Sequence, residues 1–183
     1  MRLPLYQVDA FTTLPFRGNP AGVCILDHEP ESAWMQNVAM EMNVSETAFV
    51  FPGKDIRMIR FFSPEAEVEL CGHATLSASH IIYETGIASP EEEISFSSRA
   101  GILKIRRSGD WITMNFPLYT LERIPLNDNF ERITGKVPLE LYRCSNGWIL
   151  ALLGNENEVR TMKPDFAAMK NSEYGDLIVT APS

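Results

Sequence analysis

A glycine–histidine pair at the start of a predicted helix has the clearest chemical meaning in this sequence. Residues 67–76 indicate a short strand that delivers Gly72 and His73 to the first turn of a helix. The first backbone N–H groups of a helix have no partner within it, and the helix dipole favours an anion there by about 0.3–1 kcal/mol. Gly72 leaves room for close approach, and His73 adds an imidazole that titrates near neutral pH. The segment therefore predicts a cradle for a carboxylate or phosphate.

Three polar residues are candidates for chemistry, and each has a plainer alternative. Glu46 falls where a helix gives way to a strand, so it is either a general acid–base or an ordinary surface residue. Asn19 lies in the Gly-Asn turn of residues 17–21 and either presents its amide to a site or only makes the turn. His73 is either functional or a structural histidine at a helix start.

The cysteines predict neither a disulfide framework nor a zinc site. There are three of them, Cys24, Cys71 and Cys144, widely spaced and without a Cys-x-x-Cys pair. Cys71 directly precedes Gly72 at a helix entry, a place where a thiol pKa is often lowered. It is therefore a nucleophile, a base for an α-proton, or only a small buried apolar residue. His28 and His80 lie in poor contexts for metal binding, so we expect no metal.

Composition narrows the class of protein. The 183 residues carry a formal net charge of −8, and 45% of them are hydrophobic, which suffices for a real core. No basic face of the kind that nucleic-acid-binding proteins show is visible. We find no run of roughly 18 apolar residues and no charged-then-apolar leader, so we expect a cytoplasmic protein without a membrane partner.

The elements that must position these residues follow from hydrophobic periodicity and turn signals. The first part of the chain predicts helices over 31–42 and 72–85, the second ended by Gly86, and strands over 5–11, 21–26, 47–52, 56–63, 93–97, 101–107 and 111–116. Two prolines and little periodicity indicate a linker over 117–129. The remainder predicts helices over 130–134 and 164–170, a hairpin of 140–144 with 148–153, and a last strand over 176–181.

Four segments, in order, resemble those of the PhzF-like (phenazine biosynthesis F) family. They are residues 6–12, 16–23, the glutamate motif at 42–49, and Phe62-Ser63-Pro64 with the Gly-His motif at 67–76. The resemblance implies the α+β diaminopimelate-epimerase-like fold, in which each of two halves wraps a curved, mostly antiparallel sheet around a central helix. The first half would be residues 1–116, around helix 72–85, and a partial second half would be 117–183.

The resemblance also implies an activity. The phenazine enzyme isomerises a dihydro-hydroxyanthranilate by proton transfer without a cofactor. By the match, Glu46 would be the acid–base, and Gly72, His73 and Ala74 would hold the carboxylate of a small metabolite, with Asn19 nearby. The family's second-half motifs do not occur here, so we expect a chain that is truncated, poorly active and a homodimer that covers its open sheet edges.

Two other functions stay open at this point. One is an α-carbon racemase or epimerase with Cys71 as a base, although that chemistry needs a second Cys–Gly helix entry and 144–147 indicates a hairpin. The other is a non-catalytic remnant, or a subunit that is completed by association.

Overall fold

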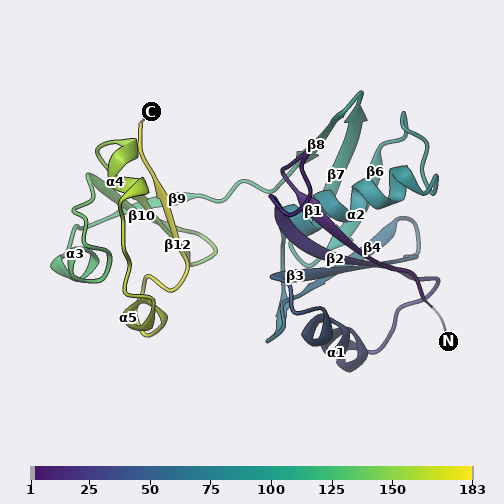
Figure 1. Cartoon of the computed structure of the whole chain (residues 1–183), viewed down its shortest axis with the longest axis horizontal. Helices are drawn as coiled ribbons and strands as arrows, with labels where there is room; N and C mark the ends of the chain where they lie inside the picture. The colour runs from purple at the N-terminus through teal and green to yellow at the C-terminus, as the bar shows by residue number, and fades with distance from the viewer. Residues whose placement is uncertain (1–2, 183) are drawn as a thin grey trace. The chain divides into compact units, whose positions relative to one another are not determined.

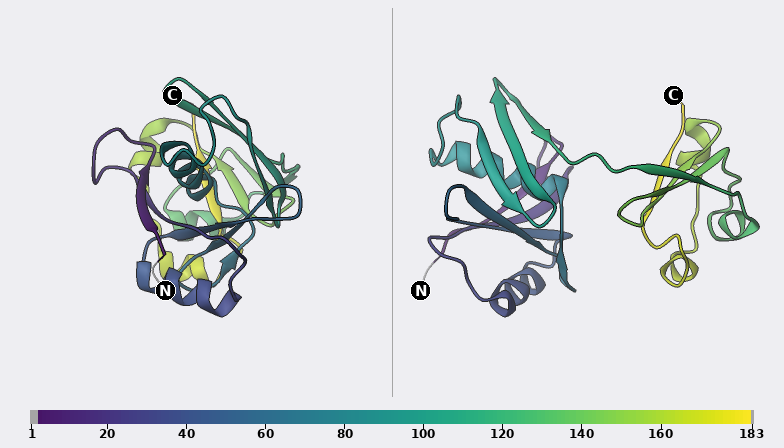
Figure 2. Two further views of the ribbon diagram at one scale, coloured as in Figure 1. Left: turned by 90° about the vertical axis from the view of Figure 1, so that its right-hand side faces the viewer. Right: turned by 180° about the vertical axis from the view of Figure 1, so that it is seen from behind.

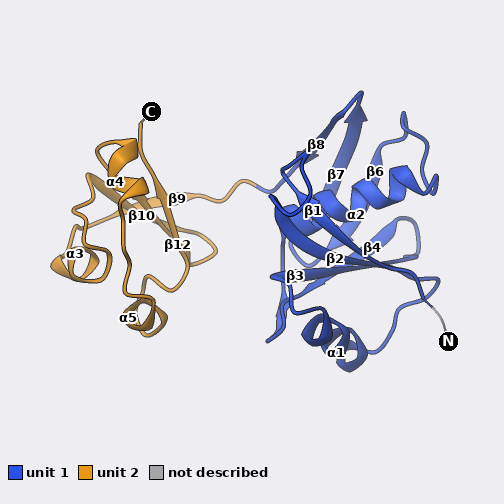
Figure 3. Ribbon diagram, in the orientation of Figure 1, with its two compact units in different colours: residues 1–117 blue, residues 118–183 orange. Residues whose placement is uncertain are grey.

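Two compact units make up the chain, and each has its own sheet and core. The computed structural model describes residues 3–182. The units are residues 1–117 and 118–183 (Figures 1 and 3). Each of the three clusters of buried apolar side chains draws on one unit alone.

Unit 1 is built on a curved mixed sheet of eight strands. The path through the sheet is β1-β2-β3-β4-β6-β7-β8, with β5 paired to β4. Neighbours are antiparallel except for β2–β3 and β4–β6, which are parallel. The strands are β1 (Leu5–Ala10), β2 (Asn19–Ile25), β3 (Glu46–Phe51), β4 (Arg57–Phe62), β5 (Glu67–Val68), β6 (Ile94–Ser98), β7 (Gly101–Ser108) and β8 (Trp111–Asn115).

Helix α2 (Gly72–Glu84) lies inside the curve of this sheet, as Figures 1 and 2 show. Its stripe of Ala74, Ala78 and Ile82 is fully buried among the apolar side chains of the sheet. Small side chains suit this position because they let the strands approach the helix closely. Gly86 follows the helix with a φ of 71°, the left-handed conformation expected of a helix-ending glycine. The predicted central helix is therefore confirmed to within one residue.

Helix α1 (Ser32–Met42) covers the opposite face of the sheet (Figure 1). Met35 and Ala39 pack there against Phe49 and Phe62. The helix also connects β2 to β3, and a parallel strand pair needs such a crossover. The crossover brings the start of β3 beside the start of β2, with Glu46 in register with Ala21.

Unit 2 is a smaller sheet of four strands with three short helices. The strand order is β12-β11-β10-β9, and α3 and the strands enclose a core around Phe130, Leu141 and Tyr174. The elements are β9 (Leu121–Ile124), α3 (Asp128–Thr134), β10 (Glu140–Cys144), β11 (Ile149–Leu152), α4 (Glu156–Arg160), α5 (Phe166–Lys170) and β12 (Leu177–Thr180). Across residues 3–182, none of the helices has the length and apolar character needed to span a bilayer.

The structure corrects two sequence expectations in unit 2. The expected linker contains β9, because its residues pair with β10 in the register Leu141↔Ile124. Helix α4 was missed, although Asn155 caps it by accepting a hydrogen bond from the backbone N–H of Glu158.

Candidate functional site

Three ionisable side chains from two elements of unit 1 meet at one point. Glu46 is the first residue of β3, Cys71 is the N-cap of α2, and His73 is the second residue of that helix. The His73 Nε2 atom lies 3.4 Å from Glu46 Oε2, and its Nδ1 atom lies 3.2 Å from Cys71 Sγ. Cys71 and His73 are buried, while Glu46 keeps 23% of its side chain exposed. The cluster therefore has one carboxylate that solvent or a substrate can reach.

A short polar chain joins this cluster to Asn19. The Ser45 hydroxyl lies 3.1 Å from His73 Nε2 and 3.4 Å from both Asn19 Oδ1 and the Pro20 carbonyl oxygen. Asn19 begins β2, and the parallel register of β2 with β3 is what places it beside Ser45. The Asn19 side chain thus lies at the rim of the cluster, two contacts away from His73 and three from Glu46.

The start of α2 presents backbone donors next to the same cluster. Gly72, His73 and Ala74 are the first three residues of the helix, so their N–H groups have no carbonyl partner within it. A Cβ atom built on Gly72 would come no closer to other residues than 3.8 Å, at Cζ of Phe116. Phe116 therefore forms an aromatic wall beside the glycine. The sequence patterns did not indicate Phe116 as a site residue, because it lies more than 40 residues after Gly72 and outside the four motif segments.

The thiol of Cys71 is a poor base, which counts against the racemase or epimerase that the sequence left open. Burial, with a smaller contribution from the Glu46 carboxylate, raises the pKa of Cys71 to about 12. The backbone N–H groups of Ala74 and His73 act in the opposite direction but are outweighed. The expected lowering of this pKa at a helix entry is therefore wrong here, because desolvation dominates the helix-terminus effect.

The protonated thiol has a consequence for His73. Because Cys71 keeps its proton, its S–H group can donate to His73 Nδ1 across the 3.2 Å contact. That contact leaves the other ring nitrogen, Nε2, to face Ser45 Oγ and Glu46 Oε2. A hydrogen on Nε2 can be donated to the carboxylate of Glu46.

Among residues 3–182, these same three residues form the one group whose side chains could hold a metal ion. One ligand atom from each of Glu46, Cys71 and His73 lies within 4.8 Å of the other two. Sequence analysis expected no metal because the motif lacks paired cysteines. The missed signal is the spacing Cys71-x-His73, which only the fold brings beside Glu46.

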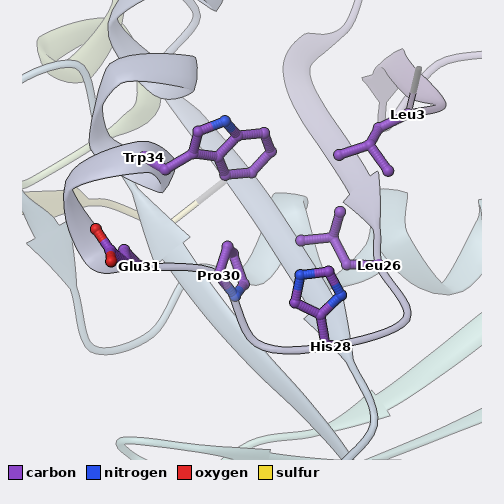
Figure 4. Close-up of a pocket in the computed structure, with 6 residues that line it drawn as sticks. All are labelled: Leu3, Leu26, His28, Pro30, Glu31 and Trp34. Atoms are coloured by element: carbon purple, nitrogen blue, oxygen red, sulfur yellow. The ribbon is translucent and has the colours of Figure 1, made fainter. Parts of the chain in front are cut away.

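A hollow elsewhere on unit 1 is unrelated to this cluster. It encloses about 380 Å³ between the start of α1 and the first strands. Figure 4 shows the residues that line it, Leu3, Leu26, His28, Pro30, Glu31 and Trp34. None of these belongs to the glutamate or Gly-His segments, and His28 is paired with its neighbour Asp27. The chemistry of unit 1 is therefore concentrated at the start of α2.

Comparison with known proteins identifies the family. A model of the phenazine biosynthesis-like protein (PhzC-PhzF) family matches residues 8–183. The chain belongs to this family. An uncharacterized isomerase of Halalkalibacterium halodurans is 40% identical over 184 residues, which cover 100% of this chain and 69% of that protein. The match runs along the entire chain, which spans about 69% of that relative's length.

Solved structures of similar proteins agree with the fold. A PhzF-family protein of Enterococcus faecalis superposes with a TM-score of 0.86 at 37% identity, covering 99% of this chain and 69% of that one. A predicted epimerase of Pseudomonas aeruginosa has a TM-score of 0.69 at 20% identity, covering 98% and 70% of the two chains. The fold is therefore the α+β diaminopimelate-epimerase-like fold that the motifs indicated.

Proposed function

We propose that the protein isomerises a small carboxylate-bearing metabolite by proton transfer, without a cofactor, and that Glu46 is the acid–base. The observation that carries the proposal is the position of Glu46, partly exposed and 3.4 Å from His73 Nε2, at the N-terminus of α2. Family membership supports the reaction class, since curated relatives are named isomerases.

The geometry gives each group a role in this proposal. The N–H groups of Gly72, His73 and Ala74 hold the substrate carboxylate, which the helix dipole also favours. Glu46 takes a proton from one carbon of the substrate and returns it to another, so that a double bond moves and the enzyme is regenerated. A positioned acid–base of this kind typically contributes about 10²–10⁴ in rate. His73 orients the Glu46 carboxylate through Nε2.

The racemase alternative has less support. It requires Cys71 as a thiolate base, and burial raises the pKa of Cys71 to about 12. It also requires a second Cys–Gly helix entry. Cys144 instead ends β10 and leads into the turn of an antiparallel hairpin with β11.

A deuterium-exchange experiment tests the proposal. The purified protein is incubated with dihydro-hydroxyanthranilate in D₂O, and incorporation of deuterium is followed by mass spectrometry. We expect exchange that Glu46→Gln reduces by about 10² or more. Glu41→Gln, a change at an exposed position of α1, is the matched control and should exchange like the wild type.

Two results would count against the proposal. Undiminished exchange in Glu46→Gln would remove Glu46 from the mechanism. Carboxylate binding at the start of α2 without any exchange, on this substrate and on simple unsaturated ring carboxylates, would favour the non-catalytic alternative.

A further inference from the structure

We propose that Glu46, Cys71 and His73 form a Zn²⁺ site that captures the ion and blocks the acid–base. Neither the family match nor the relatives' names assign a metal to this place. The site is carried by the mutual proximity of a carboxylate oxygen, a sulfur and an imidazole nitrogen, all within 4.8 Å.

Two of the three ligands already have the spacing found around a coordinated ion. Ligand atoms at about 2.0–2.3 Å from zinc in tetrahedral geometry lie about 3.5 Å from one another. The Cys71 sulfur is 3.2 Å from His73 Nδ1, whereas Glu46 Oε2 lies beside the other ring nitrogen, 3.4 Å from Nε2. An ion bound by Cys71 and Nδ1 therefore requires the partly exposed Glu46 side chain to rotate toward Nδ1, within a cluster whose ligand atoms lie within 4.8 Å of one another. Three protein ligands leave a fourth position for water, as in zinc sites that are open to solvent.

The ligand chemistry selects the ion. A thiolate and an imidazole favour Zn²⁺ over hard cations such as Mg²⁺, which prefer oxygen ligands and near-octahedral coordination. Zn²⁺ displaces the thiol proton of Cys71, so one proton is released to solvent as the Zn–S bond forms.

The charges of the ligands allow a cation to bind at the N-terminus of α2. The helix dipole disfavours a bare cation there. The Cys71 thiolate and the Glu46 carboxylate supply two negative charges, however, and neutral His73 adds none. The complex with Zn²⁺ is therefore electrically neutral, and the dipole stabilises its anionic ligands.

Surrounding contacts also suit a bound ion. Ser45 Oγ lies 3.1 Å from His73 Nε2, so it can hold the ring by its second nitrogen when the metal takes the other. The low exposure of Cys71 and His73 limits access to the open side of the cluster, where Glu46 lies.

Capture would inhibit the reaction, a consequence that rests on the proposed function. A carboxylate that coordinates Zn²⁺ cannot accept a proton from the substrate, and the ion occupies the space beside the N–H groups of Gly72–Ala74. Zinc would thus act as an inhibitor and not as a cofactor.

Metal binding is measured first without substrate, so that this result does not depend on any activity. CoCl₂ is titrated into the wild-type protein, and the thiolate-to-cobalt charge-transfer band is followed in the near ultraviolet. ZnCl₂ is then titrated against a chromogenic chelator. We expect one ion per chain, with a sulfur charge-transfer band that Zn²⁺ abolishes by displacing cobalt. MgCl₂ should not displace it.

Variants locate the ion. Cys71→Ser should abolish the charge-transfer band, and Cys71→Ser and His73→Gln should each weaken Zn²⁺ binding by about tenfold or more. Cys144→Ser and His80→Gln, which change the same residue types elsewhere, should bind like the wild type. Circular dichroism checks that each variant folds.

Three outcomes would overturn the site. They are absence of the sulfur band in the wild type, Zn²⁺ affinity that Cys71→Ser leaves unchanged, and loss of the band in Cys144→Ser. The first needs no variant and so holds even where a substitution fails to fold. If Zn²⁺ binds as expected but the wild type shows no exchange in D₂O, the metal site stands and the proposed function falls.

Discussion

The site illustrates how burial and backbone geometry divide chemical roles among neighbouring residues. Cys71 and His73 are both buried at the start of α2, whereas Glu46 reaches in from β3 and stays partly exposed. Desolvation keeps the Cys71 thiol protonated, which counts against Cys71 as a base. Under the proposed function, Glu46 is the group that exchanges protons with the substrate. A sequence motif alone does not distinguish these roles.

The carboxylate cradle predicts an effect of side-chain size at Gly72. A Cβ atom at the first residue of a helix leans toward the N-terminus, where the anion would lie. That Cβ meets only Phe116, at 3.8 Å, so the backbone leaves room for a Cβ at this position. We expect Gly72→Val to weaken binding of a small carboxylate by about tenfold or more, since a charge-assisted hydrogen bond contributes about 1.5–3 kcal/mol.

Calorimetric titration with a small aromatic carboxylate measures this affinity. Gly175→Ala in unit 2 is the control and should bind normally, because a Cβ there meets nothing closer than 3.9 Å. Normal binding by a folded Gly72→Val protein would place the carboxylate elsewhere.

At the scale of a single strand, β3 contains a buried polar atom without a partner. Thr47 Oγ1 is buried and accepts or donates no hydrogen bond among the described residues. It lies on the α1 side of the sheet beside Gly22, where a Cβ would come within 2.6 Å of it. Thr47→Val keeps the shape and the β-branched side chain but removes the hydroxyl.

We therefore expect Thr47→Val to stabilise unit 1 by about 1 kcal/mol, the lower end of the cost of an unsatisfied buried group. Thr75→Val is the matched control, because the buried Thr75 hydroxyl donates to the Cys71 carbonyl oxygen at 2.7 Å. That change should destabilise by about 0.5–1.5 kcal/mol. Urea unfolding measures both, and a destabilised Thr47→Val protein would contradict the reasoning.

Strands β4 and β5 are joined by a partly buried ion pair that gives stability a defined pH dependence. The Arg60 guanidinium donates to both oxygens of Glu67, at 2.7 Å each, and Arg99 adds a third contact. The hydrogen bonds from Arg60 lower the pKa of Glu67 below its usual value, against the effect of burial.

Because the folded pKa of Glu67 is the lower one, the ion pair stabilises the fold fully above the unfolded pKa of about 4.3. This stabilisation is lost as the pH falls through the folded pKa. We expect Glu67→Gln to cost about 1–3 kcal/mol at neutral pH and much less under acid conditions. Unfolding at several pH values, with the exposed Glu91→Gln as control, checks this. A cost that is independent of pH would mean that packing, not charge, is what Glu67 supplies.

Prediction from the sequence succeeded for elements with strong local signals. Helices α1 and α2 show clear apolar periodicity, and Gly86 marks the end of α2 as expected. Strand β9 lacked such a signal, because its first three residues are exposed and it is held by pairing with β10. At the site, the motifs indicated Glu46 and His73. The reversal of the Cys71 pKa and the approach of Phe116 depend on burial and on distant segments, which local patterns do not encode.

At the scale of the whole molecule, the open edges of the unit 2 sheet lead us to expect self-association. Its two edges are β9 and β12, and edge strands offer unpaired backbone groups to other chains. Both edges carry exposed apolar side chains, with Leu121 at 52% and Ile178 at 40% exposure. We expect a homodimer at tens of micromolar in sedimentation equilibrium, and Ile178→Lys should shift it toward monomer. A wild-type protein that sediments as a monomer would contradict this expectation.

The separation of the cores into two units predicts that unit 1 folds by itself. Its two apolar clusters consist only of residues before 118, and Glu46, Cys71 and His73 all lie within them or beside them. A unit of this length can bury enough apolar surface for independent stability.

We expect a fragment of residues 1–117 to unfold cooperatively and to retain carboxylate binding that Gly72→Val weakens. Circular dichroism with denaturant and calorimetric titration test this, with the full chain as the reference. A fragment that is unfolded would show that the start of α2 needs residues 118–183 to form, and a folded fragment that does not bind would show that unit 2 completes the cradle.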